Sequence, residues 1–139
     1  MTNKTLAQSY LLKATKRLKV LSVLLEEEAY SDVVREAQEL VELALKGILR
    51  QIGIEPPKQH DVGGLLVEFR SRLPKEVAKE AKRLADISKW LRKEREFSFY
   101  GDVDFIPTEE YTREDAERAI RDAEFVLEMA RKVIPHPII

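Results

Sequence analysis

The chain has 139 residues and a mass of 16.1 kDa, which suits one domain around a single hydrophobic core. Its 24 basic and 25 acidic residues give a formal net charge of -1, which excludes a uniformly basic nucleic-acid coat. It has no cysteine, so disulfide scaffolds, thiol nucleophiles and thiolate metal sites are excluded as well.

Helical periodicity begins at Leu6, from which apolar residues recur in steps of three and four as far as Leu25. This spacing predicts one helix with a single buried stripe, formed by Leu6, Tyr10, Ala14, Leu18, Leu21 and Leu25. Three glutamates end the helix, and we expect Ser31 or Asp32 to cap the next one. That second helix ends at Gly53, before two prolines. Its wide apolar stripe consists of Val33, Ala37, Leu40, Val41, Ala44, Leu45, Ile48 and Leu49.

A short third helix is predicted from about Val62 to Leu73, with Asp61 as its cap. Pro74 fits the first turn of a fourth helix, which we expect to run from about Lys75 to Arg95. The inward residues of the fourth helix are Val77, Ala81, Leu84, Ile87 and Leu91. An aromatic segment then follows from Phe97 to Thr112, longer than the usual connection in a helical bundle, and we expect it to be a loop held against the protein.

Thr112 and Asp115 resemble a capping box and predict the start of the last helix. Its apolar residues are Ala116, Ala119, Ile120, Ala123, Val126, Leu127, Ala130 and Val133. No segment alternates with a period of two for long enough to predict a strand. The predicted fold class is therefore all-α, an up-and-down antiparallel bundle of about five helices, in a single domain over 1–139 with 134–139 as a flexible tail.

Composition also bears on location and source. No apolar run approaches the roughly 20 residues that cross a bilayer, and the first residues lack the apolar stretch of a secretory signal. We therefore expect a cytoplasmic protein without a membrane segment. One asparagine and four glutamines beside many charged residues favour a thermophilic source.

Charge is segregated along the chain. Residues 70–95 contain ten basic and four acidic residues, whereas residues 102–124 contain nine acidic and three basic ones. One interpretation is a solvated helix surface beside a neutralising neighbour. The other is a basic face for phosphate groups, next to an acidic face that docks a partner.

The two histidines are the side chains that ordinarily titrate near neutral pH. His60 precedes the third helix, where it either acts as a general base or ligand, or packs against the helix start beside Asp61. His136 lies between two prolines in the tail. Isolated histidines do not form a metal-ligand pattern, so we expect no metal and no cofactor. No Gly-rich phosphate loop or nucleophile elbow is present, and generic motifs therefore predict no enzyme.

The segment from Trp90 to Asp102 ends a helix with Arg92 and Arg95 and continues directly into aromatic residues. Together with four other segments it resembles the HEPN domain family (higher eukaryotes and prokaryotes nucleotide-binding). Those segments are the alanine- and leucine-rich first helix, residues 37–46 with Gly53, residues 60–66, and residues 111–117. The resemblance rests on their order and spacing, and it covers most of the chain.

The resemblance implies a helical bundle that is usually a homodimer and is often encoded beside a small nucleotidyltransferase, as a toxin–antitoxin pair. In many relatives an arginine followed four to six residues later by a histidine forms a metal-independent ribonuclease site across the dimer. In such a site the guanidinium stabilises negative charge on the phosphate, while the imidazole transfers a proton.

This chain departs from the family pattern because none of the expected positions holds a histidine. Those positions are Tyr100, Gly101 and Asp102 counted from Arg95, and Phe97, Ser98 and Phe99 counted from Arg92. Tyrosine, with an ordinary pKa of about 10, is a poor base near neutrality. Nearby arginines would lower the pKa of Asp102 and weaken it as a base.

Several hypotheses remain for these residues. The first is an interaction module without ribonuclease activity, which binds nucleotide or RNA phosphate through Arg92, Arg95 and Tyr100 and pairs with a nucleotidyltransferase. The alternative is a ribonuclease that uses Arg95 with Tyr100 or Asp102, with help from His60. In a third, the partner modifies Tyr100. A purely structural interpretation pairs the arginines with Glu94, Glu96 or Asp102, and makes Phe97, Phe99 and Tyr100 a hydrophobic plug at the bundle end.

Overall fold

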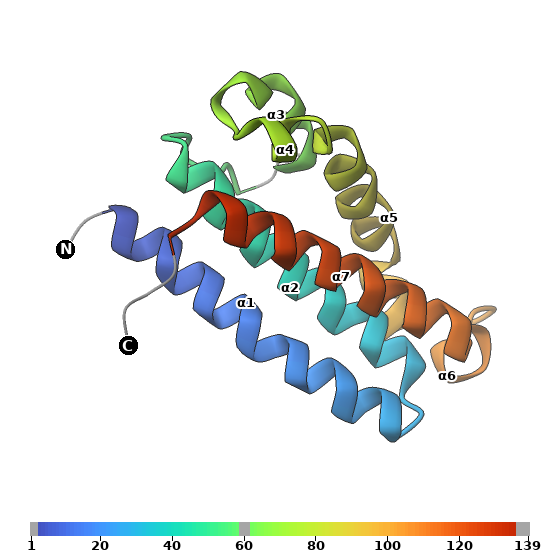
Figure 1. Cartoon of the computed structure of the whole chain (residues 1–139). Helices are drawn as coiled ribbons and strands as arrows, with labels where there is room; N and C mark the ends of the chain where they lie inside the picture. The colour runs from blue at the N-terminus through green and yellow to red at the C-terminus, as the bar shows by residue number, and fades with distance from the viewer. Residues whose placement is uncertain (1–2, 59–61, 136–139) are drawn as a thin grey trace.

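The computed structural model describes residues 3–58 and 62–135 (Figure 1). These residues form four long helices, α1 (Asn3–Glu26), α2 (Tyr30–Gln51), α5 (Ala81–Phe99) and α7 (Arg113–Val133). The short elements are α3 (Val62–Glu68), the 3-10 helix η1 (Arg70–Arg72), α4 (Lys75–Ala78) and α6 (Pro107–Glu110). Within the described residues, extended pairing is limited to an isolated antiparallel bridge between Asp102 and Phe105. The all-α fold class is confirmed.

Helix α2 lies at the centre of the bundle and contacts α1, α5 and α7. Figure 1 shows α1, α2 and α7 running side by side, with α3 and α4 at one end of the bundle and α6 at the other. Helix α5 starts at the α3–α4 end and finishes at the α6 end, close to where α2 begins (Figure 1). The arginines at the end of α5 are therefore brought beside the first turns of α2.

The apolar stripes predicted for the second, fourth and last helices are confirmed. All eight apolar residues of the α2 stripe are buried, as are the five of the fourth predicted helix. In α7, Ile120 and Val133 are partly buried and the other six are fully buried. Removing these faces from water is the main force that assembles the bundle.

The stripe predicted for α1 is partly wrong. Leu6 is 37% exposed, and the buried residues of this helix are Ala7, Leu11, Ala14 and Leu21. Leu18 and Leu25 pack only partly against the core. Alternative apolar residues on neighbouring positions allow two similar stripes, and contact with both α2 and α7 selects the one that begins at Ala7.

The predicted fourth helix, Lys75 to Arg95, is two helices in the structure. Helix α4 ends at Ala78, and α5 begins after a turn at Lys79 and Glu80 and continues to Phe99. Periodicity does not reveal the break, because Val77 and Ala81 keep a helical spacing across it and are both buried. The basic stretch of residues 70–95 is thereby divided between two ends of the bundle. The third predicted helix is likewise divided, into α3 and η1.

Helix ends were predicted correctly where a glycine with positive φ or a capping side chain forms them. Gly53 has a φ of 87° after α2, and Thr112 and Asp115 form the expected reciprocal capping box of α7. The cap predicted at Ser31 or Asp32 is wrong. The chain turns at Glu28, which has a φ of 59°, so α2 begins earlier, at Tyr30, and Ser31 is buried within its first turn.

The remaining expectations concern the chain ends and the membrane. Ile134, the first residue of the expected tail, is buried, whereas His136 and residues 137–139 lie outside the described residues. His60 and Asp61, the predicted cap, lie outside them too. In residues 3–58 and 62–135, no helix combines the length and the apolar character needed to cross a bilayer.

Candidate functional site

The candidate site lies at the C-terminal end of α5. Because α5 continues to Phe99, Phe97 and Phe99 are helical and do not belong to a loop, contrary to the sequence-based expectation. Gly101, with a φ of 71°, then reverses the chain, and the Asp102–Phe105 bridge closes a tight turn. The segment expected to be one long loop therefore consists of a helix end, a turn and α6.

Arg95 points across to α2. Its Nη2 lies 3.4 Å from Oε1 of Glu39, and Nη2 of Arg35 lies 3.5 Å from the same oxygen. Arg35 also donates from Nη1 to the backbone carbonyl of Arg95 at 3.5 Å. The pairing predicted within Glu94, Glu96 and Asp102 is therefore wrong for Arg95, because neighbouring residues on a helix project in different directions.

Arg92 lies on the same helix, three residues before Arg95, and is exposed. Residues with this spacing are close neighbours on a helix surface. The structure thus keeps both arginines of the sequence-based hypothesis at one end of α5, and it adds Arg35 from α2. The second guanidinium next to Arg95 was not predicted from the sequence.

The aromatic residues divide into a buried and an exposed set. Tyr111 is buried, and Phe105 packs against the core, so these two hold the segment to the bundle as expected. The hydrophobic plug predicted from Phe97, Phe99 and Tyr100 is wrong, because all three side chains are exposed. Two aliphatic residues of the same segment are exposed as well. We call the five residues together the exposed apolar cluster: Phe97 (45%), Phe99 (52%), Tyr100 (75%), Val103 (90%) and Ile106 (49%).

The exposed apolar cluster lies beside the arginines. The guanidinium of Arg35 stands over the ring of Phe99, 5.2 Å from its centroid. The rings of Phe99 and Tyr100 meet edge to face at 4.8 Å. The same end of the bundle therefore presents cations and open aromatic faces together.

The two candidate bases do not form an acid–base pair with Arg95. Asp102 accepts the backbone N–H of Val103 at 2.7 Å. Among the described residues, no hydrogen bond or ion pair joins Arg95 to Tyr100 or Asp102. The predicted help from His60 lies outside the described residues. The arrangement of the described residues is suited to holding an anion.

A polar network around Glu42 lies on α2, next to the site. Glu42 accepts hydrogen bonds from Lys46 at 3.0 Å and from Gln38 at 2.9 Å. Burial acts against its ionisation, but these bonds and the charges of Lys46 and Arg95 outweigh it and lower the pKa of Glu42. The pairs Arg35–Glu39 and Glu42–Lys46 have the i,i+4 spacing, which was a readable signal in the sequence.

Residues of the acidic stretch 102–124 contact α5 near Trp90. Trp90 donates its indole N–H to Asp122 at 2.9 Å, and the guanidinium of Arg118 stands 4.0 Å from the Trp90 ring. A pocket of about 240 Å³ lies there, lined by Trp90, Glu94, Phe105, Glu110, Tyr111, Asp115 and Arg118. In residues 3–58 and 62–135, no cluster of three acidic or histidine side chains is placed to hold a metal ion.

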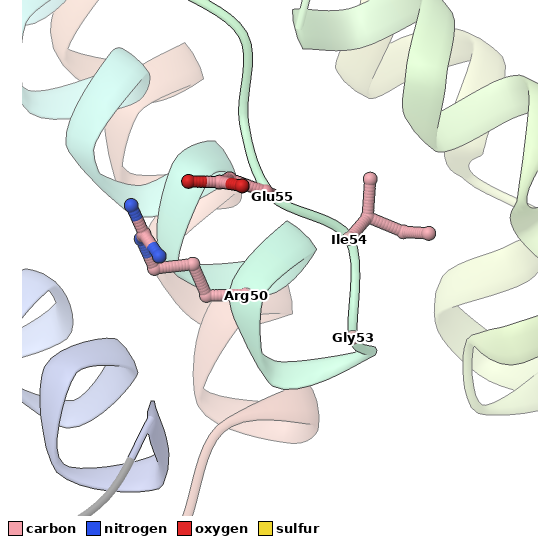
Figure 2. Close-up of a pocket in the computed structure, with 4 residues that line it drawn as sticks. All are labelled: Arg50, Gly53, Ile54 and Glu55. Atoms are coloured by element: carbon pink, nitrogen blue, oxygen red, sulfur yellow. The ribbon is translucent and has the colours of Figure 1, made fainter.

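Another pocket, of about 250 Å³, lies at the far end of α2 (Figure 2). Figure 2 shows the side chains of Arg50 and Glu55 on the same side of the turn at Gly53, while Ile54 points away. Arg50 is about 22 Å from Arg35 along the helix, from the rise per residue. This pocket is therefore separate from the arginines at the end of α5.

Comparisons with known proteins found a family model and a curated relative that match this chain. The family model for the HEPN domain matches residues 7–133. A curated protein of Methanocaldococcus jannaschii, named "Putative toxin MJ1304", is 33% identical over 132 residues, which cover 90% of this chain and 86% of the relative. No solved structure matches the chain.

Proposed function

The chain belongs to the HEPN domain family, and from this premise we propose that it is a toxin-like HEPN module that binds phosphate groups of a nucleotide or an RNA. Arg92 and Arg95 supply the positive charge, and Tyr100 supplies an aromatic face for a base. The observation that carries the proposal is the position of the Arg35 and Arg95 guanidiniums beside the exposed apolar cluster.

The chemistry of these groups matches such a ligand. Guanidinium groups present parallel N–H donors that fit the oxygens of a phosphate. Exposed aromatic rings stack on unpaired bases without sequence preference. Tyr100, at 75% exposure, is open to such contact. We favour binding over cleavage because the Arg35 and Arg95 guanidiniums of the described residues converge as an anion site would require.

We propose further that the module acts with protein partners. A homodimer would cover Phe97 and Phe99 of the exposed apolar cluster and would leave Tyr100 open to the ligand. A minimal nucleotidyltransferase, encoded nearby in a toxin–antitoxin-type pair, is the second proposed partner. The name of the Methanocaldococcus jannaschii relative as a toxin supports this setting. Co-purification with the product of the neighbouring gene tests it, and an intact mass of the co-expressed chain reveals whether Tyr100 carries an added nucleotide.

The binding proposal is tested with a fluorescein-labelled single-stranded RNA oligonucleotide, followed by fluorescence polarisation. Arg95→Ala is expected to weaken binding about tenfold, the order of one charge-assisted hydrogen bond. The matched control is Arg131→Ala, which removes an exposed arginine of α7 at the other end of the bundle and should change the affinity less than twofold. Equal affinities for wild type and Arg95→Ala would overturn the proposal.

The same mixtures distinguish binding from catalysis. Gel electrophoresis of the RNA after incubation with excess protein and a chelator should show intact oligonucleotide. Fragments that disappear in Tyr100→Phe or Asp102→Asn would instead support the ribonuclease alternative.

A further inference from the structure

We propose that the carboxylate of Glu39 occupies the position of the ligand phosphate, so that Glu39 and the ligand compete for Arg35 and Arg95. This inference rests on the proposed function and deepens it. It assigns Arg35 as a further binding residue and Glu39 as the residue that sets the affinity of the site.

The geometry identifies the position. Two guanidiniums from two different helices converge on a single oxygen, Oε1 of Glu39, at 3.4 and 3.5 Å. An oxygen within ion-pair distance of two guanidiniums has the electrostatic surroundings that a phosphate oxygen requires. The Glu39 side chain is 35% exposed and that of Arg95 is 45% exposed, so a ligand can reach the same place from solvent.

Arg35 is held in place by contacts that do not involve Glu39. Its Nη1 donates to the carbonyl of Arg95, and its guanidinium rests over the ring of Phe99. When the Glu39 carboxylate turns away, these two contacts keep Arg35 at the site. The position of the Arg35 guanidinium therefore does not depend on Glu39 alone.

The other carboxylate close to Arg95 cannot easily take the place of Glu39. Both oxygens of Glu42 are already engaged, Oε2 by Lys46 and Oε1 by Gln38. Arg35 and Arg95 thus share the single carboxylate of Glu39, and these three side chains together keep one net positive charge. Removing the charge of Glu39 would leave both guanidiniums free to bind the phosphate.

The test measures the affinity for the labelled RNA oligonucleotide by fluorescence polarisation in Glu39→Gln and Glu39→Ala. Both variants should bind about fivefold more tightly than wild type, the order that one partly exposed ion pair contributes. The matched control, Glu36→Gln, changes a partly exposed glutamate of the same helix and should leave the affinity unchanged. Arg35→Ala should weaken binding. Circular dichroism confirms that each variant is helical.

The outcomes separate this inference from the function on which it rests. If Arg95→Ala weakens binding but both Glu39 variants bind no more tightly than wild type, the competition is overturned and the site stands. If Arg95→Ala has no effect and the Glu39 variants show no gain, both proposals fail. Tighter binding by both Glu39 variants, lost again when Arg35→Ala is added, supports the competition.

Discussion

The Tyr111 hydroxyl donates a 2.6 Å hydrogen bond to the carboxylate of Glu94, which joins the turn between α6 and α7 to the last turns of α5. Burial, this bond and the charge of Glu94 together raise the pKa of Tyr111 above its ordinary value. The Tyr111 ring also contacts Phe105 at 5.7 Å, and Phe105 contacts Phe97 at 5.4 Å. These contacts fix the segment that carries the exposed apolar cluster.

Tyr111→Phe should lower the free energy of unfolding by about 1.5 to 3 kcal/mol at pH 7, since it removes a hydrogen bond to a charged acceptor. The raised pKa means that the folded state favours the protonated hydroxyl. Its contribution is therefore complete below the ordinary pKa of about 10 and declines as the pH rises above it. Urea unfolding at pH 7 and at alkaline pH measures both effects.

Tyr10→Phe is the control for this prediction, because no hydrogen bond of the Tyr10 hydroxyl occurs in the described residues and its ring contacts Arg50 instead. The control should change stability by less than Tyr111→Phe does. Equal losses of unfolding free energy in the two variants would show that the Tyr111–Glu94 hydrogen bond does not stabilise the protein.

The lowered pKa of Glu42 gives a prediction at acid pH. The folded state favours the ionised carboxylate, so its contribution is present above the ordinary pKa and is lost as the pH falls through the lower, folded value. Glu42→Gln should therefore cost about 1 kcal/mol at pH 7 and less at pH 3. Urea unfolding at the two pH values checks this, with Glu36→Gln as the control. A loss of the same size at both pH values would contradict it.

The parts of the fold that could be predicted are those that local sequence determines. The α2 stripe has a strict helical spacing with few competing apolar positions, so its buried face followed directly from the sequence. The ends at Gly53 and Thr112 depend on the conformational freedom of glycine and on a capping side chain. These signals do not require knowledge of neighbouring helices.

The candidate site was predicted only in part, because its contacts join different helices. Arg95 was identified, but its partner Glu39 lies 56 positions earlier in the chain, and no local pattern connects the two. The exposure of Phe99 and Tyr100 also depends on where α5 ends relative to α2 and α6. Hydrophobic character alone favoured burial, and that expectation was wrong for these residues.

Another prediction concerns Gly63, where α3 packs closely against α5. A Cβ atom at this position would lie 2.6 Å from the Cα of Ala85, so the two helices would have to separate. Gly63→Ala should therefore destabilise the protein by about 1 to 3 kcal/mol, despite the better helix propensity of alanine. The control is Gly64→Ala, at an exposed position of the same helix, which should be neutral or stabilising. The melting temperatures of the two variants measure this difference. Equal melting temperatures for Gly63→Ala and Gly64→Ala would contradict the close approach of α3 and α5.

The last prediction concerns the exposed apolar cluster and the proposed homodimer. Large exposed apolar side chains in one place favour an interface, because burying them removes apolar surface from water. Sedimentation should therefore give wild type twice the chain mass of 16.1 kDa, and Phe99→Asp should shift it towards the single chain. Val23→Asp on α1 is the matched control, because Val23 is 47% exposed and lies outside the cluster. A wild-type mass of one chain across the concentration range, or equal dissociation by both variants, would rule out this interface.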